Sequence, residues 1–450
     1  MPYVTPSFPF GNFERTALLR ENVGFTAKKI YDEGKGYPIV GYFVLIEPFL
    51  LVRDPALVRS VLVTRFDHFS QRGHLIPPES VDSMMGRSIF GLPIPEWKCL
   101  RRNLTPCFAG TKLKAMFPMV NRCSKRLMRL LGDAAERHEG LLDVRDTMKR
   151  FQTDVICETL LAKLLKLRFT PVSAEHFFHV VLQRHLNAGK EDTRTSVGDE
   201  ATFRTGFVDT LMRMRETPHC PNIPPLSEEK VMAQMAFFFL AGFETTSTTL
   251  TFCLFELSRH PTIQKRLAAE IMDVLKDNDW ELDYSSLSKM TYMEKVIQET
   301  LRKYPVVPLL SRECVQNYAI PGSDWTIKKG TKVSVSVLGL HYDPIYFPDP
   351  TRFDPGRFDK SEVAKRPPAC YIPYSLGPKA CIGGQFAVFS MKVALAEIVS
   401  KYEVHPSDST PEVLPIDPCV FQFSPKGPVM LKFHRRRKSL SDSASRGVQR

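Results

Sequence analysis

A cysteine that follows a glycine-containing turn and precedes a long apolar helix is the clearest candidate for chemistry in this chain. The stretch reads Tyr374-Ser-Leu-Gly377-Pro-Lys379-Ala-Cys381-Ile-Gly383-Gly. Backbone N–H groups of a tight turn and of a helix N-terminus stabilise a thiolate. Glycine, which has no side chain, lets a flat cofactor come close to the backbone. Cys381 is therefore a candidate thiolate beside a flat cofactor, and the alternative is a buried cysteine next to a turn.

An acidic residue and two threonines interrupt an otherwise apolar helical segment, in Ala241-Gly-Phe-Glu244-Thr245-Thr. Burial makes an unpaired carboxylate costly, so Glu244 is unusual at this place. A threonine hydroxyl can bond a carbonyl of the preceding turn and open the helix ladder there. Glu244 and Thr245 are therefore candidates for contact with a ligand or a water. The alternative is a surface acid on an amphipathic helix.

Two further pairs have the spacing of neighbours on one helix face. Glu299 and Arg302 are three residues apart, which allows an ion pair, and Arg357 supplies a second guanidinium downstream. One carboxylate shared by two arginines predicts a structural lock. Trp97 and Arg101, four residues apart, place an indole and a guanidinium on one face.

The elements that must position these residues are mostly helices. Apolar residues at spacings of three and four predict the long helices, and Ser227 and Pro261 mark two helix starts. Short β-like runs lie near both ends of the chain. The fold class is thus mainly α with a small β region. Helices are predicted over residues 55–64, 97–107, 110–137, 144–164, 227–259, 287–302 and after 381, and strands within 37–53, 304–355 and 429–433.

Composition and charge exclude several classes of protein. Hydrophobic residues make up 43% of the 450 residues and charged residues 24%, which excludes a disordered, collagen-like or coiled-coil chain. The net charge of +12 comes without a dense basic stripe carrying interleaved aromatics, which argues against a nucleic-acid partner. It suits an acidic protein partner or an anionic membrane surface.

The cysteine pattern indicates reduced thiols that face the cytosol. None of the ten cysteines is spaced as CxxC, and no signal peptide is present. No apolar stretch reaches the length of a membrane-spanning helix. The basic segment 434–450 is expected to be a disordered tail.

Together, in this order and spacing, the four motifs resemble those of the cytochrome P450 family, which are haem-thiolate monooxygenases. Within that family the chain resembles the microsomal detoxification P450s of insects and other arthropods. The resemblance runs from Pro9 to Phe433 and implies one domain with the P450 fold over residues 1–433. The supporting stretches are residues 66–73, 97–118, 299–308 and 347–358.

The resemblance implies a role for each motif residue. Cys381 would be the axial thiolate ligand of the iron of haem b. Thr245 and Glu244 would be catalytic, steering protons and a water to the distal oxygen. The other assignments are haem contacts for Trp97, Arg101, Arg312, Tyr374, Gly377, Lys379 and Gly383, and a structural lock for Glu299, Arg302 and Arg357.

The implied activity inserts one oxygen atom of O2 into a lipophilic small molecule, which would be a xenobiotic or an endogenous lipid or hormone. Electrons would come from NADPH through an NADPH–cytochrome P450 reductase, with cytochrome b5 as a second partner. Arg102, Lys112 and Lys114 would dock this acidic reductase. The implied location is the cytosolic face of the endoplasmic reticulum membrane.

The chain departs from the family pattern in several places. Tyr374 replaces a phenylalanine, and Lys379 replaces an arginine, which removes two-pronged binding of a propionate. The chain also begins where a membrane anchor would normally have ended. Near Cys157 to Leu161, two distant parts of the pattern are joined, so helices that cover the pocket are expected to be missing.

These departures leave other functions open. The main alternative is a catalytically impaired haem-binding or ligand-binding P450-like protein. A metal site at His176 and His179, three residues apart, lacks an evident third ligand. A helical binding protein without a cofactor is a further alternative.

Overall fold

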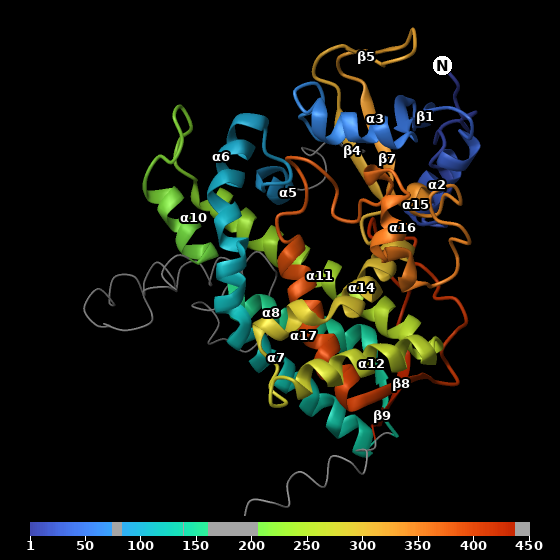
Figure 1. Ribbon diagram of the computed structural model, residues 1–450. Coiled ribbons are helices and arrows are strands. Elements are labelled where there is room, and N and C mark those ends of the chain that lie inside the picture. The colour runs from blue at the N-terminus through green and yellow to red at the C-terminus, as the bar shows by residue number, and fades with distance from the viewer. Residues whose placement is uncertain (74–82, 138, 161–205, 437–450) are drawn as a thin grey trace, which may run out of the picture.

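The computed structural model describes residues 1–73, 83–137, 139–160 and 206–436, and most of its elements are helices (Figure 1). The predicted class, mainly α with a small β region, is confirmed. The longer helices are α2 (Val23–Glu33), α6 (Ile94–Leu104), α7 (Gly110–Arg137), α8 (Val144–Leu160), α10 (Phe207–Glu216), α11 (Glu228–Arg259), α12 (Pro261–Lys276), α14 (Thr291–Lys303) and α17 (Gly384–Lys401). The shorter helices are α1 (Glu14–Ala17), α3 (Pro55–Arg59), α5 (Ser83–Arg87), α13 (Tyr284–Lys289), α15 (Val337–His341) and α16 (Lys360–Ala364).

The strands form small sheets, and two of these sheets join segments that lie far apart in the sequence. One sheet has the order β1-β2-β7-β4, from β1 (Ile39–Val44), β2 (Glu47–Val52), β7 (Lys332–Ser336) and β4 (Leu309–Glu313). Its β2–β7 pair is parallel, with Leu51 opposite Ser334. A second sheet has the order β3-β9-β8, from β3 (Leu141–Asp143), β9 (Met430–Arg435) and β8 (Tyr402–Pro406). A third pairs β5 (Tyr318–Ala319) with β6 (Thr326–Ile327).

Local capping signals explain several helix ends. The Ser227 side chain accepts the N–H of Lys230 at the start of α11, and Pro261 opens the next helix, as predicted. The predicted helix over 287–302 is instead two helices that break at Met290. The reason is a cap from another helix, because the Glu270 carboxylate of α12 accepts the N–H groups of Tyr292 and Met293 at 2.6 and 2.8 Å.

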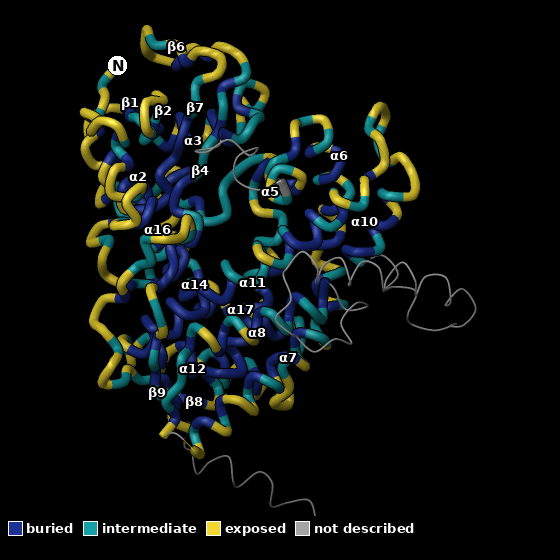
Figure 2. Tube along the Cα trace, turned by 180° about the vertical axis from the view of Figure 1, so that it is seen from behind, coloured by how far each residue is buried: buried dark blue, intermediate teal, exposed yellow. Residues whose placement is uncertain are grey.

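The interior is built around three helices. Figure 2 shows α11, α14 and α17 running through the buried part of the molecule. A second buried cluster covers the four-stranded sheet. Within the described ranges, no helix combines the length and the apolar character that a membrane crossing requires.

Two sequence expectations need correction. His434 and Arg435 belong to β9, opposite Glu403 and Tyr402, so the expected tail cannot begin at His434. Residues 437–450 lie outside the described part of the chain, as do His176 and His179. The expectation that all thiols are reduced is wrong for Cys99 and Cys220, which form a disulfide across 121 residues of sequence. Their pairing depends on helix packing, which cysteine spacing does not reveal.

Candidate functional site

A cavity of about 270 Å³ lies between α11, α6 and the loop that precedes α17. Much of its wall is apolar, with Phe108, Ile156 and Phe237 among the lining residues. On the polar side, Trp97, Arg101 and Lys379 line it. The cavity wall also includes four residues that the sequence singled out, namely Tyr374, Cys381, Gly383 and Thr245.

The Cys381 loop is held by its own backbone. The Cys381 N–H donates to the Tyr374 carbonyl at 2.9 Å, which closes the turn. Burial within the fold raises the pKa of the Cys381 thiol. The N–H of Gly383 and the positive charges of Arg101 and Arg72 act in the opposite direction. The loop thus presents one sulfur to the cavity among donors that favour negative charge.

Gly377 and Gly383 of this loop differ in what an added Cβ atom would meet. Gly377 has φ +72°, and a Cβ there would lie 2.1 Å from the carbonyl oxygen of Leu62. Only glycine can occupy this position without a shift of the backbone. A Cβ on Gly383 would meet none of the atoms of the described residues within 4 Å, so the backbone there borders open space.

Cationic side chains gather beside the cavity. Arg312 and Lys379 are buried, and Arg72 has a buried Nε. Within the described residues, Arg72 Nε and the Nε and Nη2 atoms of Arg312 have no hydrogen-bond partner. Unpaired buried donors are rare in folded proteins, so these N–H groups point to an anionic partner.

The pKa values of these three cations are all lower than usual. Burial lowers the pKa of Arg72 to about 9, that of Arg312 to about 10 and that of Lys379 to about 7. Repulsion from Arg312 adds to the effect on Arg72 and Lys379. The ammonium of Lys379 also lies 4.8 Å from the ring centroid of Trp97, a cation–π contact. An anion bound among these side chains would offset both the burial of the positive charges and the repulsion between them.

Arg72 is the residue that sequence reasoning missed. It lies in the stretch 66–73 that supports the family resemblance, but no motif spacing singled it out. The cluster also brings Arg312 from β4 next to Lys379 of the Cys381 loop, and a shared haem contact for these two residues stays a prediction.

Glu244 and Thr245 point in different directions from α11. The Thr245 hydroxyl, on the cavity wall, donates to the Ala241 carbonyl at 2.6 Å. The Glu244 carboxylate lies 3.0 Å from Nζ of Lys149 on α8 and is not on the wall. Adjacent residues project about 100° apart on a helix, which explains the divergence.

Glu299, Arg302 and Arg357 meet in the interior. Arg302 donates from Nε and Nη2 to the two oxygens of Glu299 at 2.7 and 2.9 Å. Arg357 Nε lies 3.4 Å from Glu299 Oε1, and the Asp354 N–H donates to the same oxygen at 2.9 Å. The carboxylate therefore joins α14 to the segment before the Cys381 loop.

Comparison with known proteins identifies the class to which this site belongs. The cytochrome P450 family model matches residues 25–183 and 163–433. The chain belongs to the cytochrome P450 family and is an oxidoreductase of the haem-dependent monooxygenase type. Proteins of this class act on small-molecule substrates and receive electrons from a redox partner.

Within the family the chain is similar to insect proteins. It is 33% identical to cytochrome P450 6k1 of Blattella germanica, over 89% of this chain and 85% of that protein. It is 34% identical to cytochrome P450 6j1 of the same organism, over 95% and 91%. It is 32% identical to the probable cytochrome P450 6a20 of Drosophila melanogaster, over 97% and 94%. That last alignment has 487 positions, more than the 450 residues of this chain, so the relative has internal residues that this chain lacks.

Proposed function

We propose that this protein inserts one oxygen atom of O2 into a lipophilic small molecule, a xenobiotic or an endogenous lipid or hormone. Electrons would come from NADPH through a flavoprotein reductase. The observation that carries the proposal is that Cys381, Thr245 and three cations line one otherwise apolar cavity; the cations are Arg72, Arg101 and Lys379. A cavity of this kind favours substrates with large apolar surfaces.

The residues present fit haem b. Arg72, Arg101, Arg312 and Lys379 would bind its two propionates, and the unpaired N–H groups of Arg72 and Arg312 support that assignment. Cys381 would hold the iron, with Tyr374, Gly377 and Gly383 shaping the loop around it. When bound, the haem supplies activation of O2, which thiolate ligation favours.

The chain itself contributes proton delivery and positioning. Thr245 would hold a proton or a water at the cavity wall, where its hydroxyl now donates to a backbone carbonyl. Glu244, paired with Lys149 on the other side of α11, would exchange protons with solvent rather than touch the substrate. Glu299, Arg302 and Arg357 would keep the core beneath the cofactor rigid.

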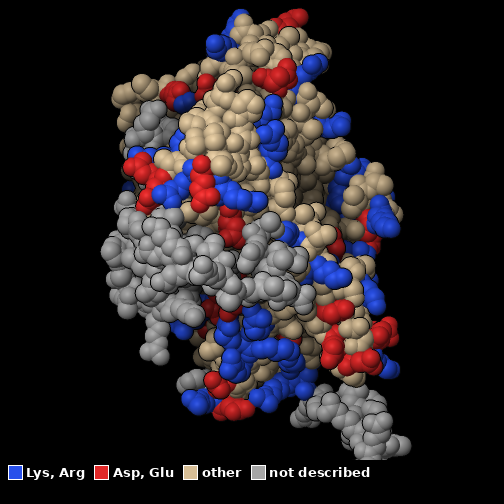
Figure 3. Space-filling view, turned by 90° about the vertical axis from the view of Figure 1, so that its left-hand side faces the viewer, with Lys and Arg blue, Asp and Glu red and all other residues tan. Residues whose placement is uncertain are grey.

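A basic surface supports an acidic redox partner. Over the first turns of α7, from Lys112 to Arg129, the charged side chains are all Lys or Arg. Figure 3 shows Lys and Arg side chains gathered on the lower part of one face, and α7 lies in the lower half of Figure 1. We assign NADPH–cytochrome P450 reductase and cytochrome b5 to this surface, with Arg102 and Lys114 at its edge. We therefore also propose that the protein works at the cytosolic face of the endoplasmic reticulum membrane, where it would meet such a reductase.

A second candidate is a P450-like protein that binds haem or ligand but turns over poorly. The observation that favours it is the alignment that exceeds the chain in length. The two family matches also overlap at residues 163–183, close to the junction at Cys157 to Leu161. The chain would then be one domain over residues 1–433 with fewer helices over the cavity.

The carbon monoxide difference spectrum of the purified, dithionite-reduced chain tests the proposal. We expect a thiolate-type Soret band in the wild type and in Cys419→Ser, a change at an exposed free thiol, and its loss in Cys381→Ser. A non-thiolate band in the wild type would contradict the assignment of Cys381. Reductase-driven oxidation of an alkoxycoumarin then separates the two candidates, because only the first predicts NADPH-dependent product.

A further inference from the structure

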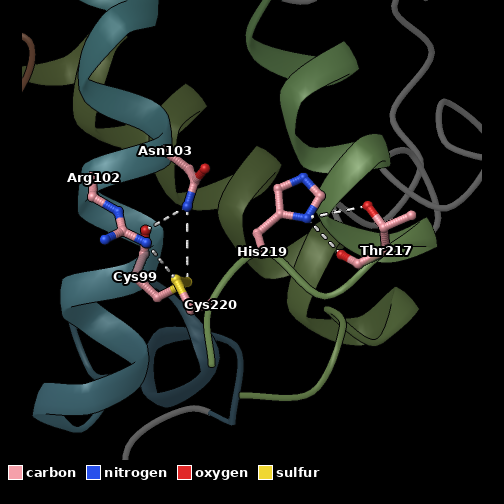
Figure 4. The surroundings of a disulfide bond; sticks show 6 residues. All are labelled: Cys99, Arg102, Asn103, Thr217, His219 and Cys220. Carbon is pink, nitrogen blue, oxygen red and sulfur yellow. Dashed lines mark hydrogen bonds between the residues drawn. A yellow bond between two sulfur atoms is a disulfide. The ribbon is translucent and has the colours of Figure 1, made fainter. Parts of the chain in front are cut away.

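The Cys99–Cys220 disulfide joins α6 to the connection between α10 and α11 (Figure 4). Cys99 lies between Trp97 and Arg101, which are on the cavity wall. A helix turns about 100° per residue, so residues two before and two after Cys99 share the face opposite to it. The disulfide is therefore attached to the face of α6 that lies opposite to Trp97 and Arg101.

The two sulfurs have different surroundings. Cys99 is buried, whereas Cys220 is half-buried and lies in a loop. The exposed Arg102 donates from Nη2 to Cys220 Sγ at 3.1 Å. A guanidinium at this distance stabilises a thiolate, which is the reactive form of cysteine. Cys220 is thus the accessible and activated sulfur, and Cys99 is its buried partner.

We propose that Cys99 and Cys220 form a thiol–disulfide exchange site for small disulfides of the glutathione class. In the oxidising direction, the Cys220 thiolate attacks one sulfur of oxidised glutathione, forms a mixed disulfide and releases one glutathione thiolate. The Cys99 thiolate then attacks Cys220 Sγ and releases the second. Two protein thiols are oxidised, one glutathione disulfide is reduced, and the two protons pass to the released thiolates. In a reducing compartment a disulfide of this kind is a regulatory bond.

Reduction would loosen α6 without detaching it. Glu96 of α6 also forms an ion pair with Lys230 of α11, and this contact does not depend on the sulfurs. The oxidised form would hold Trp97 and Arg101 more firmly at the cavity. This last step, and only this one, rests on the proposed haem contacts of those residues.

Peptide mapping of the wild-type chain tests the exchange site directly. The protein is equilibrated in glutathione buffers of different ratios, free thiols are blocked with iodoacetamide, and tryptic peptides are identified by mass. Trypsin should release residues 99–101 linked to residues 216–230 in oxidising buffer. In reducing buffer both peptides should be alkylated and unlinked, while the exposed Cys419 is alkylated throughout. Alkylation of Cys99 and Cys220 in every buffer would overturn the proposal, whether or not haem is bound.

A variant pair tests the role of Arg102. In a Cys99→Ser/Cys419→Ser background, which lacks the exposed free thiol of Cys419, the reaction of the free Cys220 thiol with Ellman's reagent can be timed at neutral pH. Adding Arg102→Gln should slow that reaction roughly 3- to 10-fold, since a neighbouring positive charge is lost. An unchanged rate would contradict the activation of Cys220.

Haem transfer to excess apomyoglobin tests the link to the cavity. Release should be faster from the reduced wild type than from the oxidised form, and Cys220→Ser should show no dependence on the glutathione ratio. If the peptide map is as expected but haem leaves the reduced and the oxidised wild type at the same rate, the disulfide does not act on the cavity through α6. Failure of the proposed function would instead show as an absence of bound haem.

Discussion

The Arg302 guanidinium binds the Glu299 carboxylate through two hydrogen bonds, and neither side chain is exposed to solvent. Arg302 also donates from Nη1 to the His341 carbonyl at 3.0 Å, so the pair ties α14 to α15. Burial raises the pKa of Glu299, although the hydrogen bonds and the charge of Arg302 act in the opposite direction. The arrangement is stable only while both partners are present.

Arg302→Ala should therefore lower the free energy of unfolding by about 3–5 kcal/mol, because it leaves a buried carboxylate without its partner. Urea denaturation measures the loss. Arg150→Ala is the matched control, since Arg150 and Asp146 form an exposed pair and the expected loss is below about 1 kcal/mol. Equal losses in the two variants would mean that the buried pair contributes no more than a surface pair.

His341 should make the protein less stable in mild acid. Its Nε2 accepts the N–H of Ile372 at 3.0 Å, and burial lowers the pKa of the imidazole to about 3. The unfolded chain binds a proton below about pH 6.5, whereas the folded chain does not until about pH 3. Stability should fall with pH through this window by at most about 1.4 kcal/mol per unit.

Urea unfolding between pH 6.5 and 4.5 measures this slope. The wild type should lose more stability than His341→Gln, which cannot titrate in this range. His434→Gln, a change at an exposed histidine, should keep the wild-type slope. Parallel curves for the wild type and His341→Gln would contradict the prediction.

Gly377→Ala should destabilise the chain more than Gly427→Ala does. Both glycines have positive φ, +72° and +78°, so both changes carry the cost of a left-handed alanine, about 1 kcal/mol. A Cβ on Gly377 also meets the Leu62 carbonyl, whereas none of the described atoms lies within 4 Å at Gly427. Thermal and urea unfolding should show an additional loss of about 1–3 kcal/mol at Gly377. A similar loss at both positions would mean that the loop can move away from Leu62.

Arg72→Gln should weaken retention of haem. If Arg72 binds a propionate, the change removes a charge-assisted hydrogen bond of about 1.5–3 kcal/mol, which corresponds to roughly 10- to 100-fold faster release. Haem transfer to apomyoglobin gives the rate. Arg65→Gln, at an exposed arginine nearby in the chain, is expected to release haem at the wild-type rate. Unchanged release from Arg72→Gln would remove this residue from the site.

Thr245→Ala should separate NADPH consumption from product formation. Loss of the hydroxyl removes a group placed for proton transfer, and such groups contribute about 10²–10⁴-fold to rates. The measurement is product formed per NADPH consumed, and Thr245→Ser should retain the wild-type ratio. Thr249→Ala is the control one turn along α11, where the hydroxyl donates to the Thr245 carbonyl at 2.9 Å. If both alanine variants behave alike, Thr245 has no special role.

Local signals in the sequence were sufficient for much of this fold. The start of α11 at Glu228 follows from the Ser227 cap, and the start of α12 follows from Pro261. The motif residues around Cys381 and the Glu299–Arg302 pair were also readable, because their spacing lies within one turn or one loop.

What the sequence did not reveal depends on contacts between distant segments. Glu270 of α12 sets the start of α14, and Lys149 of α8 pairs with Glu244. The approach of Cys220 to Cys99, and of Arg72 to Arg312, likewise requires the packed fold. Neither periodicity nor spacing encodes such contacts, since they involve residues from separate elements.

The parallel pairing of β2 with β7 has a consequence for biosynthesis. Leu51 leaves the ribosome about 280 residues before its partner Ser334, a delay of roughly 15–60 s at 5–20 residues per second. During this time the apolar hairpin of β1 and β2 has an unpaired edge, which favours association with other chains. Nascent chains of this protein should therefore depend on chaperones until β7 has been synthesised.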